Sequence, residues 1–266
     1  YGLVWSTIAE HSGEALDVSL AIQSFHKSLT QQSQPYPEFW NDMGNAYVQM
    51  GLLVNDSRLY LQAIEHLKKA VETKPLYVEG WTSLAHAFSQ LYINTMDEKF
   101  ALSGSEAFEK ATTIDPLHAD AWLHWGQLLG EQGRLNRDAK LLNQSVTKCS
   151  RAYLLDTENT AIISQLVESL SYLGASDNRL NLLIEAENKI LKIIDSVPDD
   201  PDLWRAYGIC LIGFGRYYSD PDYFEMAIEK LQYGLSLDRT DAELWHALGT
   251  AHQLIADITD DVDIIE

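Results

Sequence analysis

The chain lacks the features of a membrane-spanning or secreted protein. Its 266 residues contain no apolar run near the roughly 18 residues that a membrane helix needs, and neither a signal peptide nor an initiator Met stands at the start. Cysteine is scarce, since only Cys149 and Cys210 occur, both among apolar residues of helical pattern. We therefore expect reduced, packed thiols rather than a disulfide, and a cytoplasmic protein.

Positive charge is also scarce. Lys and Arg number 19 against 39 Asp and Glu, which gives a formal net charge of -20. Such a chain repels phosphates, so we expect no nucleic-acid partner and no anionic membrane partner. The excess acid either keeps an elongated surface soluble or favours basic partners.

Motifs for catalysis and for cofactor or metal binding are missing as well. The sequence has no phosphate-binding G-x4-G-K-[ST], no G-x-G-x-x-G after a strand and no G-x-S-x-G. Eight histidines are present, but none forms an H-x3-H pair or combines with the cysteines at zinc-ligand spacing. We expect no catalytic residues, no metal and no cofactor, and therefore not an enzyme.

What the chain does contain is a repeat. A spacing of 41 residues joins Trp40, Trp81, Trp122, Ile163 in place of a tryptophan, Trp204 and Trp245. A fixed period of this length predicts a stacked array of short helical units rather than one globular core. Because the tryptophans follow the period, we expect them to be core residues.

Two helical stripes follow each of these positions. Four residues on, a small residue recurs: Gly44, Ala85, Gly126, Gly208 and Gly249, with Val167 as the exception. Eleven residues on stand Gly51, Gly133, Gly174 and Gly215, which we interpret as helix ends. A second helix then shows small, large and small residues, as in Ala63, Leu67 and Ala70, and Pro75, Pro116 and Pro198 stop it.

This pattern resembles the tetratricopeptide repeat, W-x2-L-G-x2-Y, then A-x3-F-x2-A, then P. Trp40, Met43, Gly44, Tyr47, Ala63, Leu67, Ala70 and Pro75 follow it in order, and about six copies stand in register. HEAT and armadillo arrays have a similar period, but these offsets favour the tetratricopeptide form. The resemblance implies an all-α fold, an α-solenoid of about twelve helices in antiparallel pairs.

The period is longer than the usual repeat of about 34 residues. The offsets before the glycine and after Ala63 are normal, so we place the seven extra residues in the turn and at the start of the second helix. Asp is a favoured N-cap, and an aspartate recurs 16 residues after the tryptophan position, at Asp56, Asp97, Asp138, Asp220 and Asp261. We expect a short loop and then a lengthened second helix that begins there.

We expect one repeat domain over residues 1–266. It would comprise a partial repeat over 1–35, repeats starting near 36, 77, 118, 159 and 200, and a partial last repeat over 241–266. The polypeptide is then a fragment of a longer array, or the aspartates near its end form a frayed acidic tail.

In arrays of this family the first helices line a concave groove. The matching positions lie two before, one after and five after each tryptophan position, and the resemblance implies a partner-binding role for them. The candidates are Glu38, Asn41, Asn45, Glu79, Thr82, His86, Asp120, Leu123, Gln127, Glu168, Asp202, Arg205, Ile209, Glu243 and His246. Leu123 and Ile209 are the expected apolar anchors, although the convex face stays open as the alternative binding surface.

These candidates predict a scaffold or adaptor that binds a peptide or segment of another protein. The groove is polar to acidic, so we expect a basic or neutral segment. Some members of the family clamp acidic C-terminal tails with lysine, asparagine and arginine. Asn45 matches the asparagine, but the lysine positions are absent here, which argues against that partner. The alternatives are the regulatory half of an enzyme whose catalytic domain lies elsewhere, and a chaperone for secreted proteins.

Overall fold

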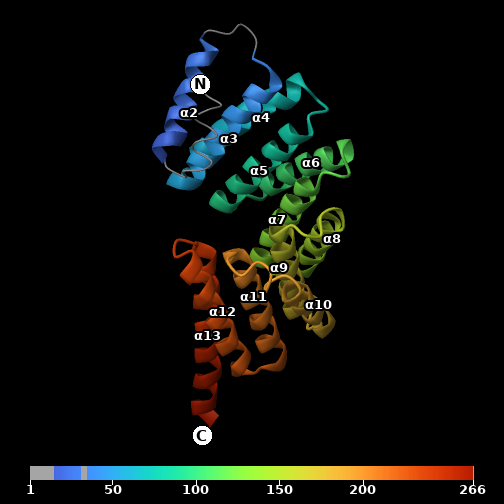
Figure 1. The fold of residues 1–266 in the computed structure, drawn as a ribbon, viewed down its shortest axis with the longest axis vertical. Helices are drawn as coiled ribbons and strands as arrows, with labels where there is room; N and C mark the ends of the chain where they lie inside the picture. Colours follow the sequence, from blue (N-terminus) through green and yellow to red (C-terminus); the bar gives the residue numbers. More distant parts are fainter. Residues whose placement is uncertain (1–14, 31–34, 266) are drawn as a thin grey trace. The chain divides into compact units, whose positions relative to one another are not determined.

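Every regular element in the described part of the chain is a helix. A computed structural model describes residues 15–30 and 35–265, with side chains as far as position 258. The helices are α2 (Ala15–Leu29), α3 (Pro37–Val54), α4 (Ser57–Thr73), α5 (Val78–Thr95), α6 (Glu98–Ile114), α7 (Ala119–Asn136), α8 (Ala139–Leu155), α9 (Thr160–Ser176), α10 (Leu180–Leu191), α11 (Pro201–Tyr218), α12 (Pro221–Leu237) and α13 (Ala242–Ile265) (Figure 1). This confirms the all-α prediction and the expected number of helices.

The helices belong to two compact units, Tyr1–Leu128 and Leu129–Glu266, and the division falls within α7. In the first unit α3 packs against α4, α4 against α5 and α5 against α6, and the two first helices α3 and α5 also touch. In the second unit α9, α11 and α13 are the corresponding first helices, and α11 contacts both of the others. That the whole chain forms a single domain remains a prediction. The first helices begin one residue after the positions at which the repeats were expected to start.

A two-residue turn joins the helices of most repeats. Its first residue has a positive φ, as Asn55 (φ 50°) and Met96 (φ 56°) show, and its second is the repeating aspartate. The Asp56 carboxylate accepts a hydrogen bond from Arg58 N at 2.9 Å, and Asp97 accepts one from Lys99 N at 3.1 Å. These contacts confirm the predicted short loop and the N-caps, because each cap satisfies a free N–H of the second helix.

The fourth repeat departs from this arrangement. Arg179 occupies the cap position and makes no side-chain cap bond, and the helix that follows, α10, has 12 residues where α8 and α12 have 17. The same repeat replaces the tryptophan with Ile163 and the small residue with Val167. Loss of the cap therefore accompanies the loss of the repeat signature.

The small residue four positions after the tryptophan makes room for the second helix of the same repeat. A Cβ added at Gly44 would lie 2.5 Å from Leu67 Cγ, and one added at Gly208 would lie 2.5 Å from Leu231 Cγ. Both leucines have no exposed surface. A glycine on α3 or α11 thus holds a leucine of α4 or α12 in direct contact with the helix backbone.

The glycine eleven positions after the tryptophan has the same role, so its prediction as a helix end is wrong. Helix α3 continues three residues past Gly51, and a Cβ there would lie 2.7 Å from the Tyr60 ring. The same pairing joins Gly133 to Leu142, Gly174 to Leu183 and Gly215 to Phe224. The extra residues of the period therefore lengthen the first helix as well as the second.

In the second repeat the large and the small residue of this pair are exchanged between the two helices. Tyr92 stands where four other repeats have glycine, and Ala101 stands where those four have a large residue. Both are buried in one cluster with Phe108 and Leu128. The second repeat therefore keeps one large and one small residue at this pair of positions, but the large one lies on the first helix.

The tryptophans lie at the edge of the core, so their assignment as core residues needs correction. The Nε1 of Trp81, Trp122 and Trp204 donates to the carbonyl oxygen of the proline six residues before it, at 2.9, 3.0 and 2.7 Å. Trp245 makes the same bond to Arg239 O at 3.0 Å and is 54% exposed. Each of these four tryptophans thus ties the start of a first helix to the loop before it.

The helices near the two ends of the chain, α2 and α13, can be compared with the predictions made for these regions. Helix α2, with Ala21 and Phe25 buried, lies within the expected partial repeat over 1–35, whose residues 1–14 and 31–34 fall outside the described part of the chain. The prediction that Asp261 begins a new helix is wrong, because the backbone of α13 continues through it to Ile265.

The packing of the glycines can be tested with one substitution at three equivalent positions. Gly44→Ala and Gly208→Ala should each destabilise the protein by about 1–3 kcal/mol, because the new methyl group overlaps a leucine. At Gly249→Ala no described atom lies within 4 Å of the added Cβ, so better helix propensity should raise stability by up to about 1 kcal/mol. Urea denaturation followed by circular dichroism measures all three, and equal midpoints would contradict the assignment.

The reversed pair in the second repeat predicts coupling between two sites. Ala101→Tyr alone should overpack the cluster, and Tyr92→Gly alone should leave a cavity worth about 3–5 kcal/mol. The double variant recreates the arrangement of Gly51 and Tyr60, so it should be more stable than the two single effects added together, by about 0.5–3 kcal/mol. Additive free energies of unfolding in urea would show that the two side chains do not share this space.

Candidate binding site

The structure distributes the fifteen candidate residues over three levels of exposure. Buried are Asn41, Thr82, Leu123, Glu168 and Ile209; half-buried are Glu38, Asn45, His86, Gln127, Asp202 and Arg205; exposed are Glu79, Asp120, Glu243 and His246. Leu123 is 4% exposed, and its role as an apolar anchor stays a prediction. Ile209 is 7% exposed but lines a pocket.

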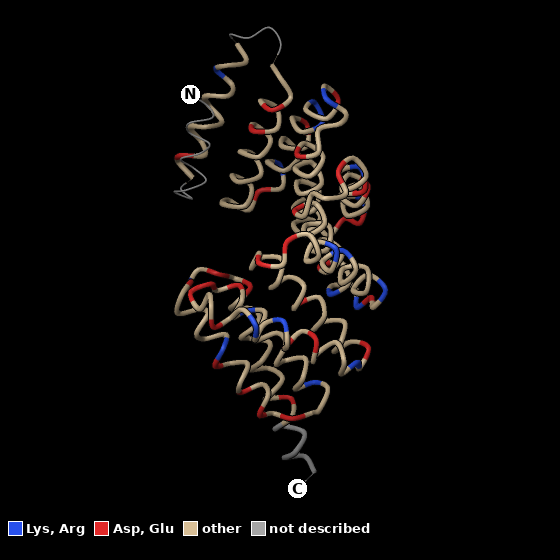
Figure 2. The backbone as a smooth tube through the Cα atoms, turned by 45° about the vertical axis from the view of Figure 1, so that its right-hand side comes forward, with Lys and Arg blue, Asp and Glu red and all other residues tan. Residues whose placement is uncertain are grey.

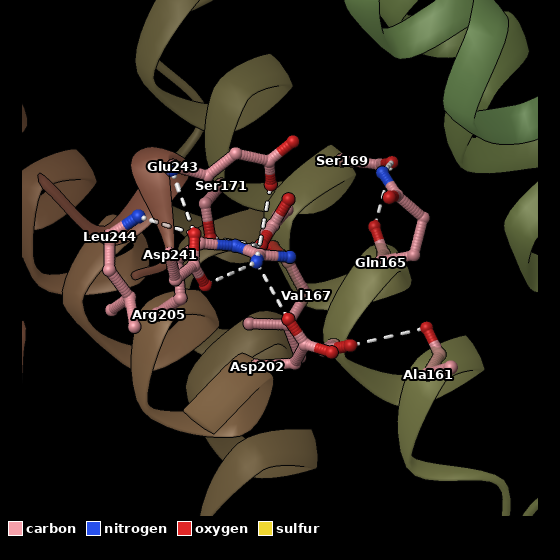
Figure 3. A network of polar contacts seen from close by, with 12 residues as sticks. Ala161, Gln165, Val167, Ser169, Ser171, Asp202, Arg205, Asp241, Glu243 and Leu244 are labelled. Carbon is pink, nitrogen blue, oxygen red and sulfur yellow. Dashed lines mark hydrogen bonds and ion pairs between the residues drawn. The ribbon is translucent and has the colours of Figure 1, made fainter. Parts of the chain in front are cut away.

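Three of the other candidates surround Arg205 of α11. Its guanidinium lies 2.9 Å from Glu168 Oε1 of α9, 2.6 Å from Asp202 Oδ1 and 3.2 Å from Glu243 Oε2 of α13. Asp241, which the sequence did not suggest, adds a fourth carboxylate at 3.4 Å. Figure 3 shows Asp202, Asp241 and Glu243 pointing toward Arg205. One cation thus connects three consecutive first helices of the second unit.

The two central charges of this cluster, on Arg205 and Glu168, are largely buried, and their pKa values are shifted. The side chains of Arg205 and Glu168 are 13% and 10% exposed, so both charges are largely removed from water. Burial raises the pKa of Glu168 to about 7, although Arg205 acts in the opposite direction. The surrounding carboxylates, Glu168 foremost, raise the pKa of Arg205 despite its own burial. The cluster therefore joins helices, and Arg205 is not a free cation for a ligand.

Asp241 also has a local role in this network. It accepts hydrogen bonds from the backbone N–H groups of Glu243 and Leu244, at 2.8 and 3.1 Å, and so caps the N-terminus of α13. The same carboxylate faces the Arg205 guanidinium (Figure 3). The cap therefore fixes the start of α13 against α11.

In the first unit the candidates form smaller polar contacts. The rings of His86 and His124 lie 5.4 Å apart between α5 and α7, and His124 Nδ1 lies 2.7 Å from Gln127 Oε1. Burial, with the neighbouring His124, lowers the pKa of His86 to about 4, which keeps its ring neutral at pH 7. Glu38 is bound at 3.0 Å by Lys74 Nζ. The acids left exposed here are Glu79 and Asp120.

The second unit contains a pocket of about 530 Å³. Its lining comes from the first helices α7, α9, α11 and α13, together with Arg137 of the turn after α7 and Leu142 of α8. Ile209, Ile212 and Ala247 give it an apolar wall, and the candidate His246 stands beside them. Only two of the fifteen predicted residues, Ile209 and His246, line this pocket.

The charged side chains of the pocket were not among the predicted residues. They are Arg134 in the last turn of α7, Arg137 in the turn that follows α7, and Arg216 near the end of α11. A signal existed, because Arg134 and Arg216 both stand twelve residues after the tryptophan position. A helical face that includes positions one and five also includes eight and twelve. Continuing the predicted face along the helix would have found both arginines.

The two cysteine side chains are buried in the core. Cys149 and Cys210 are free and buried, which confirms the prediction of reduced thiols, and burial raises their pKa to about 11 and about 12. Among the described residues, no three His, Cys, Asp or Glu side chains are grouped as a metal site would require. None of the described helices is long and apolar enough to span a membrane.

Comparison with known proteins supports the architecture alone. No protein-family model and no curated protein matches the sequence. TTC0263, a thermophilic TPR (tetratricopeptide repeat) protein of Thermus thermophilus, is similar over 80% of this chain and 100% of its own, with a TM-score of 0.59 and 20% identity. MamA is similar over 70% and 95%, with a TM-score of 0.50 and 19% identity. YrrB, a TPR protein with an unusual peptide-binding site, is similar over 85% and 98%, with a TM-score of 0.49 and 16% identity.

The fold is therefore the one that the repeat pattern predicted. The chain is an all-α array of the tetratricopeptide type, with first and second helices alternating in antiparallel pairs. Its 41-residue period fits this architecture because the extra residues are helical in both members of a pair.

The Arg205 cluster predicts a pH-dependent stability. In Arg205→Met the Glu168 carboxylate stays buried without its partner, and removal of one partner of a buried ion pair costs about 3–5 kcal/mol. The folded-state pKa of Glu168 is already above its ordinary 4.5, and the substitution should raise it further. Folded protein then binds more protons than unfolded protein, so stability falls as pH rises through the raised pKa. Urea denaturation at pH 5 and pH 8 should show the larger loss at pH 8.

A double variant provides the control for this prediction. Arg205→Met with Glu168→Gln removes the titrating group, so the extra loss at pH 8 relative to the wild type should disappear. If the single variant loses the same free energy of unfolding at both values of pH, Glu168 does not titrate as proposed.

Proposed function

We propose that the protein is an interaction scaffold rather than an enzyme, and that it holds a segment of another protein against its first helices. The observation that carries this proposal is the pocket of about 530 Å³, whose lining comes almost entirely from first helices. In repeat arrays such helices stand side by side, so one extended or helical segment can contact several repeats. Affinity would then come from a few apolar anchors, with charge setting selectivity.

Two other functions are compatible with the same fold. The regulatory half of an enzyme would bind its own catalytic domain, and a chaperone for secreted proteins would bind many unrelated segments. Both differ from an adaptor in the partner that binds to the first helices. A panel of unrelated peptides distinguishes the chaperone, because an adaptor selects by charge and anchor whereas a chaperone does not.

The charge of the partner follows from the acids that remain unpaired. In the first unit Glu79 and Asp120 are exposed, and neither has a basic partner among the described residues. Asp and Glu also outnumber Lys and Arg along the chain (Figure 2). We infer that this unit favours a basic or neutral segment over an acidic C-terminal tail, as the sequence suggested.

The proposal predicts a specific effect of charge reversal. Glu79→Lys with Asp120→Lys should weaken the binding of a rhodamine-labelled basic amphipathic peptide by about three- to tenfold, since each exposed ion pair contributes up to about 1 kcal/mol. Raising the salt concentration from about 50 to about 300 mM should weaken wild-type binding and reduce the difference between the proteins. Fluorescence anisotropy measures both effects.

A matched pair of substitutions separates local from global charge. Glu72 and Glu109 are exposed on the second helices α4 and α6, so Glu72→Lys with Glu109→Lys changes the net charge equally. Binding by this control should stay close to that of the wild type. Equal weakening by both pairs would mean that the peptide responds only to total charge, and wild-type affinity unaffected by either pair would remove the proposed surface.

A further inference from the structure

The pocket of the second unit differs in charge from the rest of the chain. Its charged lining consists of Arg134, Arg137 and Arg216, with His246 beside them, and none of the described residues that line it is acidic. The chain as a whole has a net charge of -20. A basic lining in an acidic protein indicates a ligand whose charge differs from the one that composition predicts.

Part of this basic character has a structural explanation. Arg134 and Arg216 occupy last helical turns, where a cation favourably meets the helix dipole, and Arg134 also pairs with Glu131 at 2.6 Å. Arg137 and Arg216 are exposed, and neither has an acidic partner among the described residues. Two guanidinium groups therefore remain at the pocket for a ligand. Arginine binds carboxylates well because its planar donors match their geometry.

The acidic cluster around Arg205 lies far along α11 from Arg216, whereas Arg134 does feel the carboxylates of Glu131 and Glu243, which act to raise its pKa against the effect of burial. Arg205 and Arg216 are eleven residues apart on α11, which corresponds to about 16 Å along the axis. Charges separated by more than about 8 Å are largely screened at physiological salt. The cluster therefore does not cancel the attraction of Arg216 for an anion.

The apolar wall of the pocket indicates which kind of anionic ligand fits it. Leu142, Ile209 and Ile212 line the same pocket, and a phosphate or a free carboxylate would leave these side chains unused. A nucleic acid would also meet the strong overall negative charge. A protein segment uses both parts, because one side chain can enter the apolar wall while neighbouring carboxylates reach the rim.

We propose that this pocket binds an acidic segment of a partner protein through one apolar side chain and the carboxylates that flank it. The apolar side chain lies against Ile209 and Ile212, and the carboxylates pair with Arg137 and Arg216. This inference rests on the proposed scaffold function and gives the second unit a partner opposite in charge to that of the first. One partner with a basic and an acidic stretch, or two different partners, would satisfy both units.

The test uses the full chain and an end-blocked, rhodamine-labelled peptide with Leu and Phe at its centre and Asp or Glu on both sides. Wild-type protein should bind it, and Arg137→Glu with Arg216→Glu should weaken binding by about tenfold or more. Arg151→Glu with Arg239→Glu changes the same charges at exposed positions outside the pocket and should leave binding within about twofold. Replacing Leu and Phe of the peptide with Ser should abolish binding, and thermal melts establish that the variants are folded.

Several outcomes would overturn the inference. These are no binding by folded wild-type protein, equal weakening by the two arginine pairs, or full competition by a single-stranded oligonucleotide. A concentration-dependent dimer that sedimentation detects in wild type but not in Arg137→Glu with Arg216→Glu would assign the pocket to a second copy of this chain. If the basic peptide still binds the first unit, only this inference fails; if neither peptide binds, the scaffold proposal fails too.

Discussion

Contact between a small residue on one helix and a large residue on the next holds each repeat together. It occurs at two levels, as Gly44 with Leu67 and, two helical turns further along α3, Gly51 with Tyr60. Because each level places a side chain directly on a helix backbone, the two helices of a repeat are fixed in spacing and in axial position. The caps and the tryptophan hydrogen bonds then fix only where each helix begins.

Close pairing within repeats decides what the first helices can present. One face of each first helix packs against a second helix, and some charged residues of the second unit meet between first helices. In the second unit Arg205 of α11 forms ion pairs with Glu168 of α9 and with Asp241 at the start of α13, which are the two adjacent first helices. A buried ion pair contributes little net stability but is costly to break, so its main effect is to specify how the helices meet.

Much of the fold could be predicted from sequence because the period repeats every signal. The N-cap at Asp56 follows from its recurrence and from cap chemistry. The role of Gly51 was missed because a glycine near a helix end fits a C-cap equally well. The exchange of Tyr92 and Ala101 could have resolved this, since no C-cap motif explains a compensating change of size nine residues away.

The site was less predictable because charged side chains choose their partners in three dimensions. Arg205 was recognised as the single cation of the predicted groove, yet no periodicity indicates that four carboxylates would surround it. The result is a separation of charge along α11, with paired acids at its start and the unpaired Arg216 near its end. Net charge averages over such a separation and predicts one kind of partner for the whole chain. The structure instead distinguishes the ends of the same helix, and recognition at each end depends on the charges that remain unpaired there.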